Sequence, residues 1–306
     1  MEMFLRNFFL FLSKNRTLNR SAKRWGLRFG ANRFVAGMTI PDAIQTVRDL
    51  NQKGLVCTLD HLGEFVFSEQ EANEAADYCI KTVEAIHASG VQSNLSVKLT
   101  QLGLDISRDL CVANMRRILD TAKKCGNMFV RIDMEDYAHN GVTMEILHEL
   151  LNDYDNVGTV IQAYLFKAAD DIESVKQHRV NLRLVKGAYK ESAEVAFPNK
   201  ADVDDNYKKI IKQHLLNGNY AAVATHDDNI IEYVKELEKQ YQIPRTQFEF
   251  QMLYGIRSQS QIDLAKEGYK VRVYVPYGDD WYGYFMRRLA ERPANVAFIL
   301  KGFFTR

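Results

Sequence analysis

The sequence has no excess of charge of either sign. Its 40 lysines and arginines nearly balance 39 aspartates and glutamates, and the formal net charge of the 306 residues is +1. No basic stripe stands out along the chain. Proteins that bind nucleic acids usually concentrate basic side chains on one surface, because they neutralise phosphates. The composition therefore argues against DNA or RNA as a main partner.

Closely spaced cysteines and glycine-rich loops are also absent. The four cysteines, Cys57, Cys79, Cys111 and Cys125, form no C-x-x-C pair and have no metal-ligand spacing to the histidines. We therefore expect reduced thiols in the core of a cytoplasmic protein, and no metal site. No G-x-G-x-x-G motif follows a predicted strand, which argues against a Rossmann-type dinucleotide site.

One apolar stretch, residues 3–12 (MFLRNFFLFL), stands near the N-terminus. It is too short to span a bilayer, and no small-residue cleavage site follows it before the basic stretch 14–24. Its phenylalanines recur at helical spacing, which is typical of a helix that packs on the protein body or lies on a membrane surface. We expect residues 1–41 to form a helical arm packed on the body. Peripheral contact with the inner face of the membrane is the alternative.

From residue 42 onward, short β-rich runs alternate with amphipathic helical stretches. The predicted strands are residues 55–59, 94–99, 128–133, 158–163, 181–185, 221–225, 247–251 and 270–275. The predicted helices are residues 68–87, 110–123, 144–151, 204–216, 229–241 and 258–267. Eight strands with helical connections, and no linker rich in proline or glycine, predict one α/β domain over residues 42–306. We expect a (β/α)8 barrel of the TIM type rather than two domains.

Polar residues stand at the carboxyl ends of the predicted strands, which surround one mouth of such a barrel. They are Lys98, Asp133, Gln162, Arg183, Lys186, Thr225, His226 and Tyr274. Burying so many polar groups without a ligand would leave their desolvation uncompensated. The sequence therefore predicts a binding site at this mouth.

The segment YFMRRLAE, residues 284–291, puts Tyr284, Arg287, Arg288 and Glu291 within two helical turns. Taken alone, it is best interpreted as a solvated basic stretch with an ion pair between Arg287 and Glu291. Beside a polar barrel mouth, two guanidiniums and an aromatic ring suit a small substrate with a carboxylate and an apolar body. We expect this final helix to cover the mouth and to bind such a carboxylate.

Together these motifs resemble the proline dehydrogenase family, flavin-dependent enzymes built on a distorted (β/α)8 barrel. The most specific pieces are LVKGAY preceded by Arg183, THD after the sixth strand, and Tyr284 with Arg287, Arg288 and Glu291. The resemblance covers about residues 30–303 and is closest to the single-function bacterial form. It implies oxidation of L-proline to pyrroline-5-carboxylate by hydride transfer to FAD, as the first step of proline catabolism. A quinone is the implied electron acceptor.

The resemblance also implies a set of site residues. The substrate carboxylate is expected at Lys98, Arg287 and Arg288, and Glu64 is expected to pair with Arg287 as a gate. The substrate ring is expected to contact Tyr189, Leu253, Tyr274 and Tyr284. FAD is expected to contact Asp133, Met134, Gln162, Arg183, Lys186, Gly187, Ala188, Thr225 and His226.

The implied chemistry gives individual residues roles. Arg183 is the candidate to stabilise the negative charge that develops on the flavin, and Asp133 is expected to orient Lys98 or the flavin. A structural pairing of Asp133 with Lys98 or His226 is the alternative. We expect His61 and His226 to position other groups, because hydride transfer needs no histidine base.

Two other functions are compatible with parts of the sequence. A Schiff-base lyase could use Lys98 or Lys186 as a nucleophilic amine on a small carboxylate substrate. A non-catalytic barrel could sense a metabolite or dock through the N-terminal aromatic helix, although the polar mouth argues against it.

Overall fold

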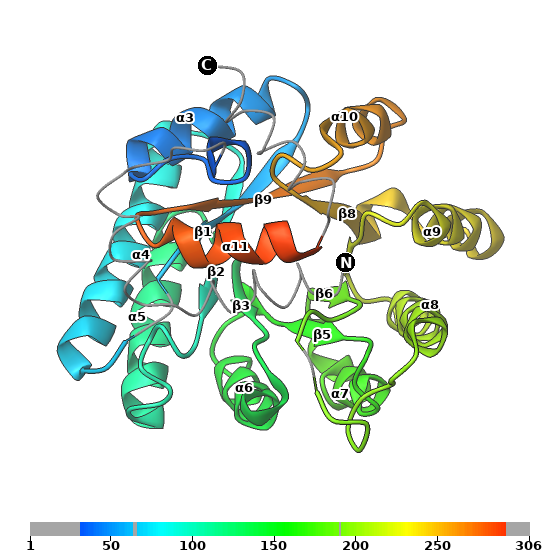
Figure 1. Ribbon diagram of the computed structural model, residues 1–306, viewed down its shortest axis with the longest axis horizontal. Coiled ribbons are helices and arrows are strands. Elements are labelled where there is room, and N and C mark those ends of the chain that lie inside the picture. The colour runs from blue at the N-terminus through cyan, green and yellow to red at the C-terminus, as the bar shows by residue number, and fades with distance from the viewer. Residues whose placement is uncertain (1–30, 64–65, 190, 292–306) are drawn as a thin grey trace.

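The computed structural model describes residues 31–63, 66–189 and 191–291, and side chains up to residue 288 (Figure 1). Most of the predicted N-terminal arm, the predicted gate residue Glu64 and the side chain of Glu291 lie outside these ranges. The expectations placed on them stay predictions.

Nine parallel strands form one sheet in the order β4-β3-β2-β1-β9-β8-β7-β6-β5. Only Thr159 separates β4 from β5, so the two ends of this order are consecutive in the chain and the sheet curls into a nearly closed barrel. The strands are β1 (Val56–His61), β2 (Ser93–Lys98), β3 (Val130–Asp133), β4 (Val157–Gly158), β5 (Val160–Gln162), β6 (Leu182–Val185), β7 (Ala221–Ala224), β8 (Phe248–Leu253) and β9 (Val271–Tyr277).

The predicted (β/α)8 barrel is therefore confirmed, with its fourth strand divided into β4 and β5. At the division, Thr159 donates its hydroxyl to the carbonyl of Ile132 on β3, at 2.9 Å. A side chain thus supplies a contact between the third and fourth strands where regular strand geometry is interrupted. Strands β1, β8 and β9 each extend two residues beyond their predicted ends.

Helices surround the strands on all sides (Figure 1). They are α3 (Ile40–Asn51), α4 (Glu69–Ser89), α5 (Arg108–Lys124), α6 (Tyr137–Leu150), α7 (Ala168–Ser174), α8 (Lys200–Leu216), α9 (Asp228–Tyr241), α10 (Ser258–Lys266) and α11 (Trp281–Glu291). The helix predicted at residues 144–151 begins seven residues earlier, because Asp136 caps it by accepting from the backbone N–H of His139. Helix α3 begins with a reciprocal cap between Thr39 and Asp42.

The two faces of the barrel strands differ in polarity. Outward side chains such as Leu95, Ile132 and Leu184 join the apolar core shared with the helices. Inward side chains are largely polar, and hydrogen bonds cross the interior between strands that are not neighbours, as from Arg183 on β6 to Ser96 on β2. Layers of branched aliphatic side chains fill a typical barrel of this class. The polar interior here marks the barrel itself as part of a site.

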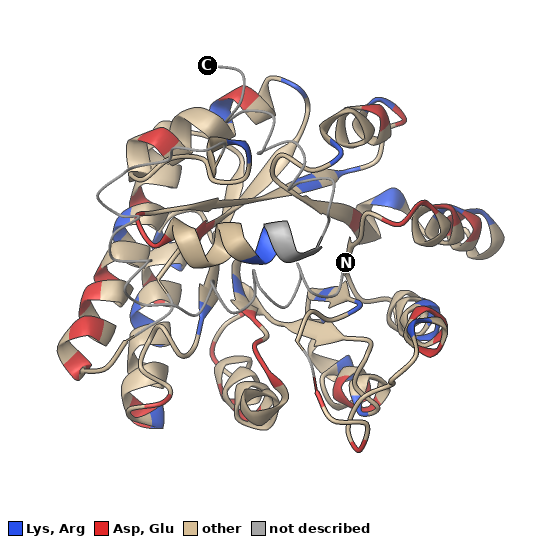
Figure 2. Cartoon of the chain, in the orientation of Figure 1, with Lys and Arg blue, Asp and Glu red and all other residues tan. Residues whose placement is uncertain are grey.

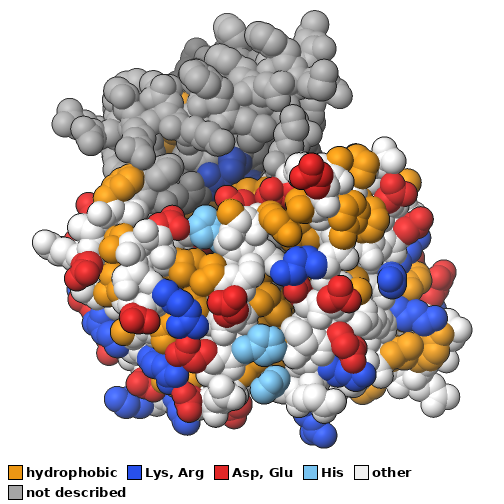
Figure 3. Space-filling view, turned by 90° about the horizontal axis from the view of Figure 1, so that it is seen from below, with side chains coloured by type: hydrophobic (Ala, Val, Ile, Leu, Met, Phe, Trp, Pro, Cys, Tyr) orange, Lys and Arg blue, Asp and Glu red, His pale blue; other side chains and the backbone are white. Residues whose placement is uncertain are grey.

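On the described residues, charges of both signs mix at the outer surface. Acidic and basic side chains are interspersed along the helices and over the face that is seen from below (Figures 2 and 3).

The four cysteines are free, and Cys57, Cys79 and Cys111 are buried as expected. Within the part of the chain that the structure describes, no helix has the length and apolarity needed to cross a bilayer.

Candidate active site

Helix α11 covers one side of the barrel mouth. Its Trp281 and Phe285 belong to an apolar cluster with Phe34, with Leu62 after β1 and with Ile256 after β8. Leu62 and Ile256 follow the carboxyl ends of their strands, so the helix lies at the end where the polar residues were expected. Its basic segment lies over the centre of the barrel in the view of Figure 2.

A hydrogen-bonded network beneath this helix joins five strands. Oδ1 of Asp133 on β3 accepts a hydrogen bond from Nη1 of Arg183 on β6, at 2.5 Å. Its Oδ2 accepts a hydrogen bond from the hydroxyl of Tyr274 on β9, at 2.8 Å. Arg183 also donates from Nε to Oε1 of Gln251 on β8 at 2.6 Å, and from Nη2 to Oγ of Ser96 on β2 at 3.1 Å. The guanidinium is therefore held by three different side chains.

The network fixes Tyr274 as a hydrogen-bond donor. Burial, followed by the negative charge of Asp133, raises the pKa of Tyr274 well above its usual value. The phenol thus stays protonated and holds Asp133, while the guanidinium carbon of Arg183 lies 5.1 Å from the centroid of its ring. Ring, guanidinium and carboxylate form one rigid group.

Asp133 thus pairs with Arg183 and Tyr274, and not with Lys98 or His226 as in the alternative structural interpretation. Lys98, at the end of β2, is instead held by Asp60 on β1, whose two carboxylate oxygens both lie 3.2 Å from Nζ. Asp60 is 1% exposed. Asp60 was not among the residues predicted from the sequence. The signal that could have indicated it is its place two residues after Thr58 on the same strand, which puts both side chains on the inward face.

Glu135, in the loop after β3, is a second residue that the sequence did not single out. Its carboxylate accepts from the hydroxyl of Thr100 at 2.7 Å and from the backbone N–H of Thr100 at 3.2 Å. Its carbonyl accepts from Nε2 of Gln162 at 3.1 Å. Burial raises the pKa of Glu135 more than the hydrogen bonds from Thr100 lower it. The residue connects the ends of three neighbouring strands.

Lys186 points away from the central network. Its Nζ lies 2.5 Å from Oδ1 of Asp204 on α8 and 2.7 Å from Oδ2 of Asp227 after β7. Burial lowers the pKa of Lys186, but the hydrogen bonds to the two carboxylates outweigh it and raise the pKa. An amine held in this protonated state is a poor nucleophile, which argues against Lys186 in a Schiff-base mechanism.

His226 and His61 each contact a neighbouring element of the barrel. His226 accepts the backbone N–H of Leu253 through Nε2 at 3.1 Å, and so connects the ends of β7 and β8. Thr225 accepts the backbone N–H of Asp227. His61 stacks on Tyr78 with ring centroids 4.0 Å apart, and burial lowers the pKa of His61.

The other predicted site residues lie around the rim. Tyr284 is buried, and the guanidinium carbon of Arg288 lies 5.0 Å from the centroid of its ring. Arg287 and Arg288 are both half-buried on α11. Met134 is buried, with its sulfur 3.5 Å from Nδ2 of Asn140. The residues that follow Lys186, which are Gly187, Ala188 and Tyr189, are exposed.

Comparison with curated proteins gives several full-length relatives. A sequence model described as proline dehydrogenase matches residues 43–301. Proline dehydrogenase 1 of Bacillus subtilis (strain 168) is 56% identical over 298 residues, which are 97% of this chain and 98% of the relative. Proline dehydrogenase 2 of that strain is 53% identical over 98% of this chain and 99% of the relative. Proline dehydrogenase of Deinococcus radiodurans is 48% identical over 92% of this chain and 91% of the relative.

In two solved structures with the same fold, the matching part belongs to a longer chain. Proline utilization A (PutA) from Bdellovibrio bacteriovorus, inactivated by N-propargylglycine, is similar with a TM-score of 0.81 and 27% sequence identity. That match covers 90% of this chain and 34% of the PutA chain. The D779W mutant of Bradyrhizobium japonicum PutA has a TM-score of 0.72 at 24% identity, and this likeness concerns the fold alone.

Proposed function

The chain belongs to the proline dehydrogenase family, and we propose that it oxidises L-proline to pyrroline-5-carboxylate with FAD bound at the barrel mouth. It is a proline dehydrogenase, an oxidoreductase of the first step of proline catabolism. The observation that carries the proposal for the site is the rigid group of Asp133, Arg183 and Tyr274 beneath α11.

The residues around the mouth fit a flavin cofactor. Oε1 of Gln162 is buried and has no hydrogen-bond partner among the described residues, so it offers an acceptor to a ligand N–H group. Gly187 adopts φ +113°, and a Cβ on it would lie 2.2 Å from Cδ1 of Tyr164. Glycine therefore lets the LVKGAY segment turn tightly against that ring at the rim. We propose that FAD is held by Asp133, Met134, Gln162, Arg183, Lys186, Gly187, Ala188, Thr225 and His226.

Bound FAD would supply the acceptor for a hydride. Arg183 is the proposed catalytic residue, because its fixed guanidinium can stabilise developing negative charge without reorganising. Asp133 holds Arg183 and Tyr274 in place through its two oxygens. Its proposed role is to position them, since both oxygens already accept hydrogen bonds.

The substrate is proposed to bind between α11 and the ends of β2, β8 and β9. Lys98, Arg287 and Arg288 would bind the carboxylate of L-proline, and three cations at that end would also discourage a protonated amine. Tyr189, Leu253, Tyr274 and Tyr284 would surround the ring. The buried ring of Tyr284 and the fixed ring of Tyr274 are the firmest parts of this wall.

We further propose a membrane quinone as the electron acceptor. A cytoplasmic enzyme that uses such a quinone must approach the inner face of the membrane, and the aromatic residues 3–12 have the composition of an interfacial helix. Peripheral contact of this kind needs no spanning helix.

The visible absorption spectrum of the purified protein tests the function. We expect a yellow protein whose flavin is released on denaturation and identified as FAD rather than FMN. L-Proline should bleach the flavin anaerobically, and a short-chain quinone should restore the colour where NAD does not. A flavin-free protein that cannot be reconstituted would refute the assignment, and rapid reoxidation by NAD would refute the acceptor.

A further inference from the structure

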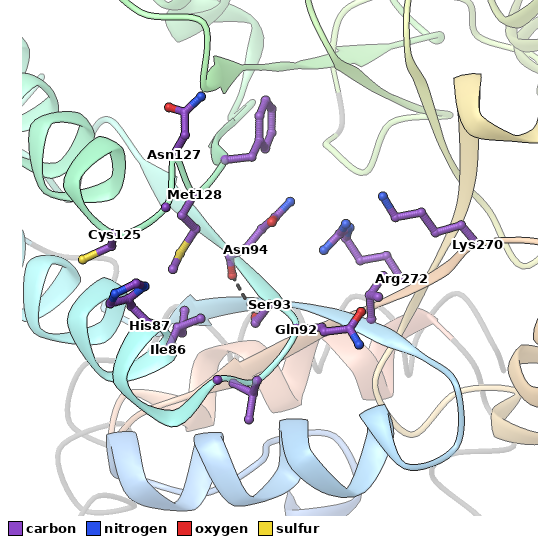
Figure 4. Close-up of a pocket in the computed structure, with 15 residues that line it drawn as sticks. Ile86, His87, Gln92, Ser93, Asn94, Cys125, Asn127, Met128, Lys270 and Arg272 are labelled. Atoms are coloured by element: carbon purple, nitrogen blue, oxygen red, sulfur yellow. Dashed lines mark hydrogen bonds between the residues drawn. The ribbon is translucent and has the colours of Figure 1, made fainter.

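A cavity of about 550 Å³ opens at the end of the barrel opposite the mouth (Figure 4). It lies among the N-terminal ends of β1, β2, β3 and β9 and the loops that follow α4 and α5. Its apolar wall is formed by Ile86, Met128 and Phe129. Its polar side includes Lys270, Arg272 and the side-chain amides of Gln92, Asn94 and Asn127. The residues that line it include two cations and no carboxylate.

Positive charge is in excess around this cavity. The carboxylate of Glu249 accepts hydrogen bonds from Nε and Nη2 of Arg272, at 2.6 and 3.1 Å. Nζ of Lys270 lies 3.3 Å from Oε2 of the same carboxylate. The guanidinium carbon of Arg131 lies 4.6 Å from the ring centroid of Phe129, and Arg131 donates to the carbonyls of Thr159 and Asn181 and to the amide oxygen of Asn181. Lys270 and Arg272 thus share the carboxylate of Glu249, whereas Arg131 does not line the cavity.

Part of the positive charge near the cavity is buried. Arg131 is 2% exposed and Arg272 is 7% exposed. Burial, and then the charge of Arg183, hold the pKa of Arg131 well below its usual value. Burial lowers the pKa of Arg272, but Glu249 outweighs it and raises the pKa. Lys270 shares the same carboxylate, so one positive charge is left over, and an anion in the cavity would balance it.

Donors for such an anion are present. Arg272 has five N–H groups, of which two bind Glu249 and one binds the carbonyl of Cys57, so two remain. Lys270 is 46% exposed at its side chain, and its ammonium faces the same opening as the amide of Asn94 (Figure 4). The C-terminal ends of α4 and α5 add partial negative charge nearby, but their last turns carry the basic residues His87, Lys123 and Lys124.

We propose that this cavity binds a small oxyanion, a phosphate or carboxylate group, between Lys270 and Arg272. The apolar wall of Ile86, Met128 and Phe129 would face the uncharged part of such a ligand. The site is distinct from the mouth and does not depend on the oxidation of proline.

Calorimetric titration of the protein, with the flavin that it retains, tests the proposal. Inorganic phosphate and succinate serve as the two probes at constant ionic strength, and they decide between a phosphate and a carboxylate ligand. We expect saturable binding of one of them, weakened about tenfold or more by Lys270→Gln, which removes one charge-assisted contact. Lys266→Gln, a change of an exposed lysine on α10, is the matched control and should leave the affinity unchanged.

Two results would overturn the proposal. One is the absence of saturable binding of either probe. The other is binding that Lys270→Gln leaves intact and that Arg287→Ala abolishes, because that pattern would place the anion at the mouth. Asn94→Ala, in the same cavity, provides a second variant should Lys270→Gln fail to fold. It is expected to weaken binding of the same probe.

Discussion

Tyr274 donates its hydroxyl to Oδ2 of Asp133 at 2.8 Å, across the barrel from β9 to β3. The other oxygen of Asp133 binds Arg183, so a ring proposed to contact the substrate and a guanidinium proposed to stabilise charge share one carboxylate. Neither side chain can move without breaking one of these two hydrogen bonds. This coupling is the physical basis for treating the wall of the proposed substrate pocket as rigid.

A rigid Tyr274 ring should exclude substrates with an extra hydroxyl. We expect proline to be preferred over 4-hydroxyproline, and Tyr274→Ser to shrink the preference, mostly by losing proline activity. A hydrophobic pocket alone rejects an added hydroxyl only about a hundredfold, so a larger ratio indicates steric exclusion. The ratio of the kcat/KM values for the two substrates measures this preference. Tyr274→Phe keeps the ring and should keep most of the preference, and an unchanged ratio in Tyr274→Ser would remove this residue from the pocket.

The arginines of α11 should govern substrate affinity rather than cofactor content. Arg288→Ala and Arg287→Ala should each raise KM for proline roughly a hundredfold, because a lost charge-assisted bond to a partly buried carboxylate costs about 2–3 kcal/mol. Flavin absorbance per protein should stay nearly unchanged. Arg288→Lys keeps the charge but loses the two parallel N–H donors of the guanidinium, so its KM should lie between those of the parent and of Arg288→Ala. Lys239→Ala on α9 is the control, and parental kinetics in Arg288→Ala would contradict the role.

Lys98 and Asp60 should behave as a coupled pair in stability measurements. Lys98→Met leaves Asp60, which is 1% exposed, without its counter-charge, and should lower the free energy of unfolding by about 2 kcal/mol. Adding Asp60→Asn should recover part of that loss. Urea denaturation of the parent, the two single variants and the double variant gives the coupling free energy. Purely additive effects would show that the pair is not coupled.

Gly187 should be required for the shape of the rim. In Gly187→Ala, the new Cβ would lie 2.2 Å from Cδ1 of Tyr164 at a φ of +113°, so the LVKGAY segment must shift. We expect lower flavin content and a lower melting temperature. Gly54→Ala is a matched control, because its φ is +79° but no atom lies within 4 Å of the new Cβ. It should cost about 1 kcal/mol and keep the flavin; equal flavin loss in both variants would refute the steric explanation.

Acid should weaken the fold through Glu249. Burial raises the pKa of this carboxyl, but Arg272 outweighs it, and the pKa falls from 4.5 to about 2. A depressed folded-state pKa contributes stability that is present above pH 4.5 and is lost as the pH falls toward 2. The contribution is on the order of 3 kcal/mol. Glu249→Gln should be less stable at neutral pH and should show a flatter decline below pH 4.5, and an equally steep decline would contradict this assignment.

The sequence by itself determined the order of elements and the composition of the mouth. Apolar β-rich runs alternate with amphipathic helical stretches, because a parallel barrel strand is buried against helices and each helix buries one face. The residues that surround the mouth could also be predicted from the sequence, since the carboxyl ends of parallel strands all meet at one mouth. Helix α11 was predicted over that mouth from its motif and its place after the last strand.

Only the tertiary structure decided which polar groups pair. Tyr274 and Asp133 are 141 residues apart, and Arg183 lies 50 residues from Asp133. Such contacts depend on how many residues each strand is shifted along its neighbour, which local patterns do not specify. For this reason Asp60, and not Asp133, became the partner of Lys98, and Lys186 turned toward Asp204 and Asp227. Lys270 and Arg272 at the opposite end likewise came to share Glu249 only through barrel closure.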